Sequence, residues 1–430
     1  MTSYEAAVAA IHQLPRLAKT GGHERITALL AALGHPERGQ YVHVTGTNGK
    51  GSTANAIAHI LMASGLTVGL YTSPFIMRFN ERIAIDGVPL DDDQLARAYD
   101  VVAIALASLQ AAQPGFGVTE FEFITAMAFW VFDHQGVDLA VIEVGIGGDT
   151  DSTNVITPLV SVITSVGLDH AKLLGNTLAS VATHKAGIIK PERPVVTAAL
   201  PAEAAAAVAA KVATTHSRWL VDGQDFGVDH ATMVGWGQRF SYWDDQGRLA
   251  ALTLPLVGQI QQHNAALAIQ ASKLAAAALH WPLASKEIRR GLAASQWPAR
   301  MEKLSDDPLI VIDGAHNPQG IAALRDTLQQ VFGHQSLTLI VGILADKDVA
   351  QMITLLEHTP YRLWLVPVPD NPRAEALADY PDAAKLRRFE TWQAALAAHL
   401  ADYRDEPVVI TGSLYLASAV RQALFAAPNA

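Results

Sequence analysis

Short apolar runs alternate with longer segments of helical periodicity along most of the chain. Tyr41–Thr45 is predicted to be a short buried strand, followed by a Gly-rich turn and a helix from about Ser52 to Ala63. Thr119 and Glu122 have the spacing of a capping box, which predicts the start of an apolar helix that ends near Gly136. This alternation predicts an α/β fold with a mainly parallel sheet. We also expect a helix at Asp91–Ala112 and strands at Thr67–Thr72, Leu139–Glu143, Leu159–Thr164 and Pro194–Thr197.

The pattern changes twice in the second half of the chain. Met233–Leu254 alternates residue by residue around a turn at Asp244–Gly247, which predicts a small antiparallel excursion. A helix ends near Ala294, and a second series of strands and helices begins after Trp297-Pro298. We therefore predict an N-terminal domain over residues 1–295, a linker over 296–300 and a C-terminal Rossmann-like α/β domain over 301–430. Strands of the second domain are expected at Leu309–Ile312, Leu337–Val341, Arg362–Val366 and Val408–Thr411.

Composition narrows the classes of protein that fit this pattern. Half of the 430 residues are hydrophobic, and 31 Lys and Arg against 41 Asp and Glu give a net charge of −10. This acidic balance argues against a nucleic-acid partner. The chain has no cysteine, which excludes disulfides, thiolate catalysis and Cys-ligated metals. We expect a cytoplasmic protein with no membrane partner, since residues 1–16 lack a signal-peptide pattern and no apolar run is long enough to span a bilayer.

Eight residues between the first strand and its helix form a glycine-rich loop, Gly46–Thr53. Glycines let successive backbone N–H groups and a helix N-terminus face one anion, which predicts a nucleotide-binding P-loop. The string departs from the common P-loop pattern, because Val44 stands at the first glycine position and a glycine follows Lys50. A glycine-rich turn without a ligand is the alternative. The expected nucleotide contacts are Thr47, Asn48, Gly49, Lys50, Gly51, Ser52 and Thr53.

The loop and six later strings together resemble one family. GTNGKGS resembles the P-loop variant of the Mur ligase superfamily, and in this form that of its folate branch, the folylpolyglutamate synthases. The resemblance covers nearly the whole chain and is nearest to the lactobacillus-type monofunctional members. The six strings follow in the family's order: YTSPFIMRFNERI (71–83), EVGIGGDTDSTNV (143–155), GLDH (167–170), HKAGIIK (184–190), DGAHNP (313–318) and TGSLY (411–415).

The resemblance implies an ATP-dependent ligase. The γ-carboxylate of a reduced folate would become an acyl phosphate, which the amine of L-glutamate then attacks. Expected cofactors are ATP and Mg²⁺, with a monovalent cation as a further candidate, and the enzyme is expected to be a monomer. Three alternatives stay open: a bifunctional dihydrofolate synthase, a Mur-type ligase acting on a peptidoglycan precursor, and a nucleotide-gated binding module. The second would need a UDP-binding domain before the P-loop, and we see no such pattern there.

For the metal, the resemblance implies Glu143 and His170 as ligands, with Ser73 and Ser52 supplying further oxygens. It also implies that Lys185 is carbamylated, since a neutral amine that captures CO₂ becomes a carboxylate close to the metal. Burial beside other cations favours that neutral amine. Taken alone, each of these residues has a simpler interpretation. Glu143 would be a solvated carboxylate at a strand end, His170 a hydrogen-bonded structural histidine, and Lys185 a surface charge.

In the later part of the chain, the resemblance implies further contacts with ATP. Asn264 would meet the adenine edge, with a helix N-cap as the alternative interpretation. Arg300 would reach the γ-phosphate, and Asp313 would bind a ribose hydroxyl. His316 would face phosphate or the incoming amine. With these contacts, the residues expected to act directly in catalysis are Lys50, Glu143, His170, Lys185, Arg300 and His316.

Candidate contacts with the other substrates are fewer. Phe75 could stack on a pterin and Arg82 could pair with a carboxylate of the folate, with core packing as the alternative for Phe75. Lys347 and Ser413, with His316, are candidates for glutamate binding. Where many dual-function members have Gly-Gly-Arg-Leu-Asp-Ala-Thr-Asn, residues 147–154 are GGDTDSTN. Asp149 stands at the position of that arginine. The absence of the positive charge there favours the interpretation of the protein as a monofunctional enzyme.

Overall fold

The structure is a computed structural model that describes residues 2–16, 22–380 and 386–426. It contains two compact units. Unit 1 comprises Met1–Thr232, Arg239–Pro255 and Gln262–Ser295, and unit 2 comprises Met233–Gln238, Leu256–Gln261 and Gln296–Ala430. The predicted domains are each one continuous stretch, whereas unit 2 takes in two short segments, Met233–Gln238 and Leu256–Gln261, from within the predicted N-terminal domain. The boundaries at residues 295 and 301 therefore remain a prediction.

A largely parallel sheet forms the centre of unit 1, in the order β4-β3-β2-β5-β1-β6-β7-β8. β1 (Tyr41–Thr45) is buried along its length and pairs in parallel with β5 (Leu139–Glu143) and β6 (Val160–Ile163). An antiparallel hairpin that the sequence did not predict extends one edge. The remaining strands are β2 (Val68–Tyr71), β3 (Ile83–Ile85), β4 (Val88–Pro89), β7 (Val195–Thr197) and β8 (Trp219–Val221).

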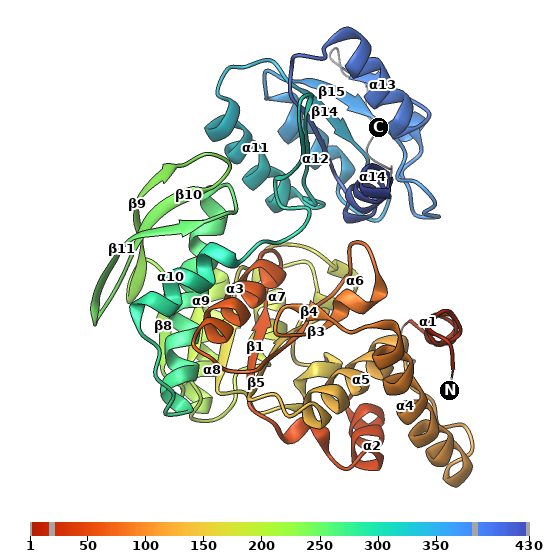
Figure 1. Cartoon of the computed structure of the whole chain (residues 1–430), viewed down its shortest axis with the longest axis vertical. Helices are drawn as coiled ribbons and strands as arrows, with labels where there is room; N and C mark the ends of the chain where they lie inside the picture. Colours follow the sequence, from red (N-terminus) through yellow and green to blue (C-terminus); the bar gives the residue numbers. More distant parts are fainter. Residues whose placement is uncertain (1, 17–21, 381–385, 427–430) are drawn as a thin grey trace. The chain divides into compact units, whose positions relative to one another are not determined.

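Two predicted helix starts in unit 1 are confirmed. Capping boxes open α4 (Asp92–Ala112) at Asp91 and α5 (Glu120–His134) at Thr119. These helices pack with α1 (Tyr4–His12) and α2 (Glu24–Ala32) around a shared apolar core (Figure 1). The other helices are α3 (Lys50–Ala63), α6 (Ala171–Leu174), α7 (Leu178–Ala186), α8 (Ala202–Thr215), α9 (Gln259–Ala278) and α10 (Ser285–Ala294), with 3-10 turns at Pro36–Arg38, Phe79–Arg82 and Ser152–Val155.

One helix in the described ranges, α4, is long and apolar enough to cross a membrane by length and composition. Its side chains at Leu95, Ala98 and Val102 are buried in the core that it shares with α5. Its apolar face is therefore used for packing within unit 1.

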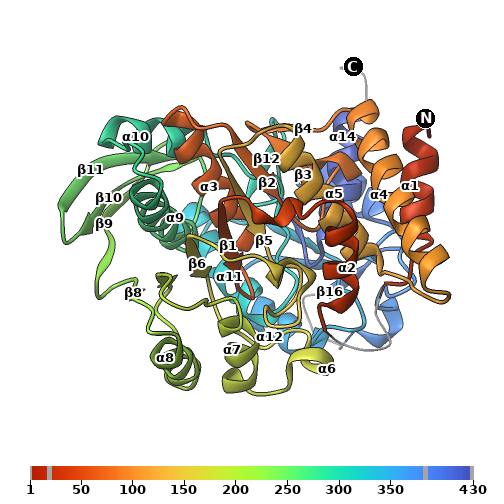
Figure 2. The ribbon, with the colours of Figure 1, turned by 90° about the horizontal axis from the view of Figure 1, so that it is seen from below.

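A three-stranded sheet follows in the chain, in the order β11-β10-β9. Its strands are β9 (Phe226–Met233), β10 (Gln238–Asp244) and β11 (Gly247–Leu254). Only two residues connect β10 to β11, a length that joins antiparallel neighbours. The predicted antiparallel excursion is therefore present, and it begins at Phe226, before the predicted start at Met233. Figure 2 shows α10 beside β11, against which it packs.

Unit 2 has its own sheet, in the order β12-β13-β17-β14-β15-β16. The five strands from β13 to β16 in this order run parallel, and β12 is antiparallel to β13. The strands are β12 (Glu302–Asp306), β13 (Leu309–Ile312), β14 (Thr338–Val341), β15 (Arg362–Leu365), β16 (Leu386–Arg388) and β17 (Val408–Thr411). The helices are α11 (Pro318–Phe332), α12 (Val349–Glu357), α13 (Trp392–Asp402) and α14 (Leu414–Ala426), with a 3-10 turn at Leu377–Asp379.

Candidate active site

The P-loop joins β1 to α3 and is held against the loop that follows β6. The backbone N–H of Thr47 donates to the carbonyl of Ser165 at 3.0 Å, and that of Asn48 donates to its hydroxyl at 2.8 Å. Gly49 directly precedes α3 and has a φ of 87°, in the left-handed region that favours glycine. The loop thus brings a rigid turn to a helix N-terminus, the arrangement that binds phosphate.

Close contacts explain two glycines of the loop. A Cβ at Gly46 would lie 1.9 Å from the Thr164 hydroxyl oxygen, and one at Gly49 would lie 2.5 Å from the Asn264 side-chain oxygen. The second contact shows that the buried Asn264, on α9, lies directly against the P-loop. Sequence reasoning selected Asn264 without being able to place it beside Gly49.

Lys50 begins α3, and its ammonium group curls back over the loop. Its Nζ donates to the Gly46 carbonyl at 3.0 Å and lies 3.4 Å from the Thr47 carbonyl. The charge is therefore held at the mouth of the loop, where phosphate oxygens would bind.

Buried oxygen atoms close to the loop fit a hard cation. Glu143 ends β5 beside Val44 of β1, is 4% exposed, and accepts a hydrogen bond from the Ser73 N–H at 3.2 Å. Ser52 and Thr53 are also buried, and their hydroxyl oxygens have no hydrogen-bond partner among the described residues. A carboxylate together with such hydroxyl oxygens suits Mg²⁺, which also binds substrate phosphates and water.

His170 fits this set less well than the oxygen ligands. It is exposed and stands directly before α6, with a φ of 52°. Its loop is tied to the P-loop, because the Gly167 N–H donates to the Thr47 hydroxyl at 2.9 Å. Within the described ranges no three His, Asp or Glu side chains cluster as a metal site.

Lys185 lies on α7 and is 2% exposed. Burial, together with the nearby charge of Lys50, lowers its pKa to about 7. The alternative interpretation of Lys185 as a surface charge is therefore wrong. Near neutral pH a large fraction of this amine is uncharged, which is the form that reacts with CO₂.

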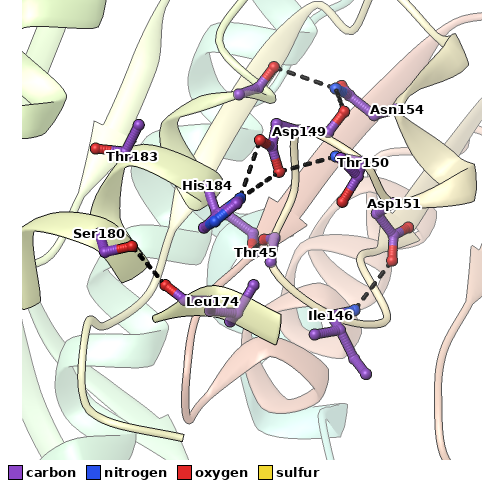
Figure 3. Close-up of polar contacts among 12 residues, drawn as sticks. Thr45, Ile146, Asp149, Thr150, Asp151, Asn154, Leu174, Ser180, Thr183 and His184 are labelled. Carbon is purple, nitrogen blue, oxygen red and sulfur yellow. Dashed lines mark hydrogen bonds and ion pairs between the residues drawn. The ribbon is translucent and has the colours of Figure 1, made fainter. Parts of the chain in front are cut away.

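The loop after β5 is fastened to the end of α7 (Figure 3). The His184 Nδ1 lies 2.8 and 3.0 Å from the two carboxylate oxygens of Asp149, and the Asp149 N–H donates to the His184 carbonyl at 2.9 Å. The Asn154 amide donates to the carbonyls of Asp149 and Gly187 at 3.1 and 3.2 Å. Asp149 is therefore paired with His184, the residue directly before Lys185. Sequence reasoning missed this contact.

The predicted folate contacts form an aromatic and cationic cluster. The Arg82 guanidinium lies 5.3 Å from the ring centroid of Phe75 and 5.4 Å from that of Phe79. His12 of α1 meets the Phe79 ring edge-on, with centroids 5.6 Å apart. Sequence reasoning missed His12, since no local signal links α1 to this loop, and it also missed Phe79, which lies in the same string as Phe75 and Arg82.

Three predicted residues meet at the carboxyl end of β13 in unit 2. The two carboxylate oxygens of Asp313 accept hydrogen bonds from the N–H groups of Met301 and Ala315, at 2.9 and 2.8 Å. Burial raises the pKa of Asp313, and the charge of Arg300 opposes this rise. His316 Nδ1 lies 2.8 Å from the Gly314 carbonyl. The Asp313 carboxylate thus ties the segment that carries Arg300, before β12, to the turn that carries His316, after β13.

The two predicted glutamate contacts differ in exposure. Ser413 is buried, and its hydroxyl accepts a hydrogen bond from the Tyr415 N–H at 3.1 Å, which caps the start of α14. Lys347 is half-buried on the loop after β14. Its position suits substrate binding better than that of Ser413.

Similar proteins explain this combination of a P-loop with a second α/β unit. The chain is 61% identical over 423 residues to the folylpolyglutamate synthase of Lacticaseibacillus casei, covering 98% of this chain and 99% of that protein. The chain belongs to the folylpolyglutamate synthase family. A member from Bacillus subtilis, a dihydrofolate synthase/folylpolyglutamate synthase, is 34% identical, with 98% of this chain and 99% of that protein covered.

Structure and domain comparisons agree with this membership. A solved FPGS–AMPPCP–folate complex superimposes with a TM-score of 0.91 at 60% identity, over 98% of this chain and all of that one. The Mur ligase, glutamate ligase domain profile matches residues 299–414. The expected family and fold class are thus confirmed, including an N-terminal nucleotide-binding domain in the matched structures.

Proposed function

We propose that this protein uses ATP to join L-glutamate to the γ-carboxylate of a reduced folate, giving a folylpolyglutamate, ADP and phosphate. The observation that carries the proposal is the full-length identity of 61% to a folylpolyglutamate synthase. The P-loop, in which Gly46, Gly49 and Lys50 have the contacts that phosphate binding needs, supports it independently. Family membership also argues against the peptidoglycan-precursor and binding-module alternatives.

The reaction needs two displacements. An oxygen of the folate γ-carboxylate attacks the γ-phosphorus of ATP, the bond to ADP breaks, and an acyl phosphate forms. The glutamate amine then attacks the acyl carbon, phosphate leaves, and the nitrogen loses a proton. The P-loop amides and Lys50 stabilise charge on the transferring phosphoryl group, so this unit contributes positioning and electrostatics.

Ser52, Ser73 and Glu143 would hold Mg²⁺, with His170 as a further candidate. When bound, the metal supplies positive charge that balances the phosphate oxygens. The proposal is supported by the buried Ser52 hydroxyl without a partner and by the buried Glu143 carboxylate.

We also propose that Lys185 is carbamylated. Its burial and its pKa of about 7 supply the neutral amine that the modification requires. A ¹³C-bicarbonate NMR spectrum should show a carbamate signal in the wild-type protein and none in Lys185→Ala. Full activity of Lys185→Ala would overturn a functional role for the modification.

The remaining assignments stay predictions. These are Asn264 for adenine, Arg300 for the γ-phosphate, Asp313 for ribose, His316 for phosphate or the amine, Phe75 and Arg82 for folate, and Lys347 and Ser413 for glutamate. A cytoplasmic location, a monomeric state and a monovalent-cation requirement are also expected.

A bifunctional dihydrofolate synthase is the second candidate function, since the B. subtilis relative has that name. The Asp149–His184 contact favours the monofunctional enzyme, because it places a paired carboxylate where dual-function members have an arginine.

Phosphate release with MgATP and L-glutamate tests both functions, using tetrahydrofolate or dihydropteroate as the acceptor and mass spectrometry for the products. We expect glutamate-dependent turnover with tetrahydrofolate alone. Turnover with both acceptors would establish the bifunctional enzyme. Turnover with neither would overturn the folate assignment.

A further inference from the structure

Unit 2 has a cavity at the amino end of β15, with a volume of about 250 Å³. Three residues with predicted substrate contacts, Asp313, Lys347 and Ser413, instead follow the carboxyl ends of β13, β14 and β17, which run parallel to β15. The cavity is therefore at the opposite edge of the sheet from these residues. Its lining residues are Pro360, Tyr361, Arg362, Trp364, Arg387 and Tyr403.

Strand register places the main charged and aromatic side chains of the cavity on one face of the sheet. Trp364 of β15 is the register partner of Arg387 of β16. Side chains two residues apart on a strand point to the same face, so Arg362 lies on this face too. Tyr403, directly after α13, lies across from them, with its ring centroid 6.2 Å from that of Trp364.

The two arginines of the cavity differ in how far their charge is balanced. Both terminal nitrogens of Arg362 contact the Glu406 carboxylate, one of them at 3.2 Å, and the guanidinium lies 3.8 Å from the centroid of the Tyr403 ring. Arg387 lies 3.8 Å from a carboxylate oxygen of Asp402, which is too far for a hydrogen bond. Within the described part of the chain, its guanidinium makes no hydrogen bond, so N–H donors remain for an anion.

Arg387 is held over the aromatic floor of the cavity. Its guanidinium lies 4.8 Å from the ring centroid of Trp364 and 5.0 Å from that of Phe389, and these two rings are 4.9 Å apart. Trp364 is 1% exposed, so the floor is fixed by the core of unit 2. Stacking of this kind holds a guanidinium by its face and leaves its edge for a planar partner with two oxygens.

We propose that this cavity binds a small aromatic carboxylate. The carboxylate would pair with the edge of Arg387 through two parallel hydrogen bonds, and the ring would pack against Tyr403 and Pro360. The inference is independent of the proposed function, because it concerns a different edge of the unit 2 sheet.

Charge and volume decide the class of ligand. Arg362 and Arg387 stand against Glu406 and Asp402, so the cavity has no net charge and favours a singly charged anion over a phosphate dianion. Its volume is below the roughly 300–1,000 Å³ of pockets that hold drug-sized ligands, which favours a single ring.

Titration of the full-length protein with benzoate, followed by saturation-transfer NMR, tests the inference. Benzoate should bind wild type, and Arg387→Gln should weaken its affinity at least about tenfold, because the variant loses a charge-assisted pair. Arg387→Lys should weaken binding less than Arg387→Gln does, since it keeps the charge and loses the planar edge. Asp402→Asn should strengthen binding, because it removes the carboxylate that competes for Arg387.

Two further ligands define the class. Benzamide keeps the ring without the charge and should bind at least about tenfold more weakly than benzoate. Inorganic phosphate keeps a charge without the ring, and it should displace benzoate only at a concentration at least about tenfold higher than benzoate itself requires.

Arg404→Gln is the matched control. Arg404 is exposed and stands directly after Tyr403, but it does not line the cavity. This variant loses the same charge as Arg387→Gln and should bind benzoate as wild type does. A thermal melt of each variant checks that folding is unchanged.

Three results would overturn the inference: no binding of benzoate to wild type, equal affinity in wild type and Arg387→Gln, or equal affinity for benzoate and phosphate. None of them would affect the proposed function, which glutamate-dependent turnover measures. Arg387→Gln should keep wild-type turnover, because the cavity is separate from the residues assigned to the reaction. A wild-type protein without turnover that still binds benzoate through Arg387 would overturn the proposed function alone.

Discussion

The P-loop of unit 1 and the loops after β14 and β17 of unit 2 lie at equivalent places, at the carboxyl ends of parallel strands. They hold their polar groups differently. Ser52, Glu143 and Lys185 are buried beside the P-loop. At the carboxyl ends of the unit 2 strands, the side chain of Arg373 is 44% exposed and Tyr415 is 48% exposed.

This difference matches the two tasks of the proposed reaction. Charge that develops during phosphoryl transfer is best stabilised by groups that are fixed in advance and shielded from water. An exposed cation attracts a charged amino acid and lets it exchange with solvent. We therefore expect substitutions at the P-loop to reduce turnover or stability, and those in the loops after β14 and β17 to alter substrate affinity.

The largest effect should come from Lys50→Ala. Loss of the ammonium group at the mouth of the loop should lower kcat by about 10³-fold, since it removes an electrostatic contact to the transferring phosphoryl group. Phosphate release at saturating substrates measures this, with the exposed Lys286→Ala as the control. A fall in kcat of less than tenfold would contradict the assignment.

Lys185→Met tests whether the buried amine is neutral. The folded-state pKa of about 7 is below the usual 10.5, so between these values the unfolded chain alone keeps the proton. The free energy of unfolding of wild type should then rise with pH across this window, by about 1.4 kcal/mol per pH unit relative to Lys185→Met. Urea unfolding from pH 7 to 10 in CO₂-free buffer measures the difference, and equal slopes for the two proteins would disprove it.

Gly46→Ala should distort the P-loop. The new Cβ would collide with the Thr164 hydroxyl, and a displacement of this kind should raise the KM for ATP about 10- to 100-fold. Gly117→Ala is the matched control, because a Cβ there meets nothing within 4 Å. Wild-type affinity for ATP in Gly46→Ala would show that the loop adjusts freely.

Ser413→Ala separates a helix cap from a substrate contact. Loss of the hydroxyl that accepts from the Tyr415 N–H should lower the free energy of unfolding by about 1 kcal/mol. If Ser413 also binds glutamate, as predicted, the KM for glutamate should rise about tenfold, as measured by initial rates. A KM within about threefold of wild type, with the loss of stability, would show that the hydroxyl only caps α14.

Asp149→Asn should have the smallest effect. Its pair with His184 is partly exposed, so we expect a loss of about 0.2–1 kcal/mol in the free energy of unfolding and little change in kcat. Asp402→Asn, from a looser surface pair, is the control. Turnover of dihydropteroate by Asp149→Asn, but not by wild type, would show that this carboxylate restricts the choice of acceptor.

Local sequence signals predicted much of the fold. The strands Tyr41–Thr45, Leu309–Ile312 and Val408–Thr411 have the predicted bounds, because continuous apolar runs between polar turns specify buried strands. The caps at Asp91 and Thr119 were also predictable, since a capping box spans only four residues. Short edge strands such as Val88–Pro89 and Leu386–Arg388 were missed because they have too few residues to show a period.

The sequence by itself determined the α/β class, the P-loop and the family, because these depend on local patterns and ordered strings. Tertiary structure alone decided the surroundings of each side chain. It buried Lys185, brought Asn264 against Gly49 and joined Asp149 to His184. It also placed Arg373 beside Tyr415. Such contacts join residues tens to hundreds of positions apart, and no periodicity encodes which distant side chains will share a dielectric environment or a hydrogen bond.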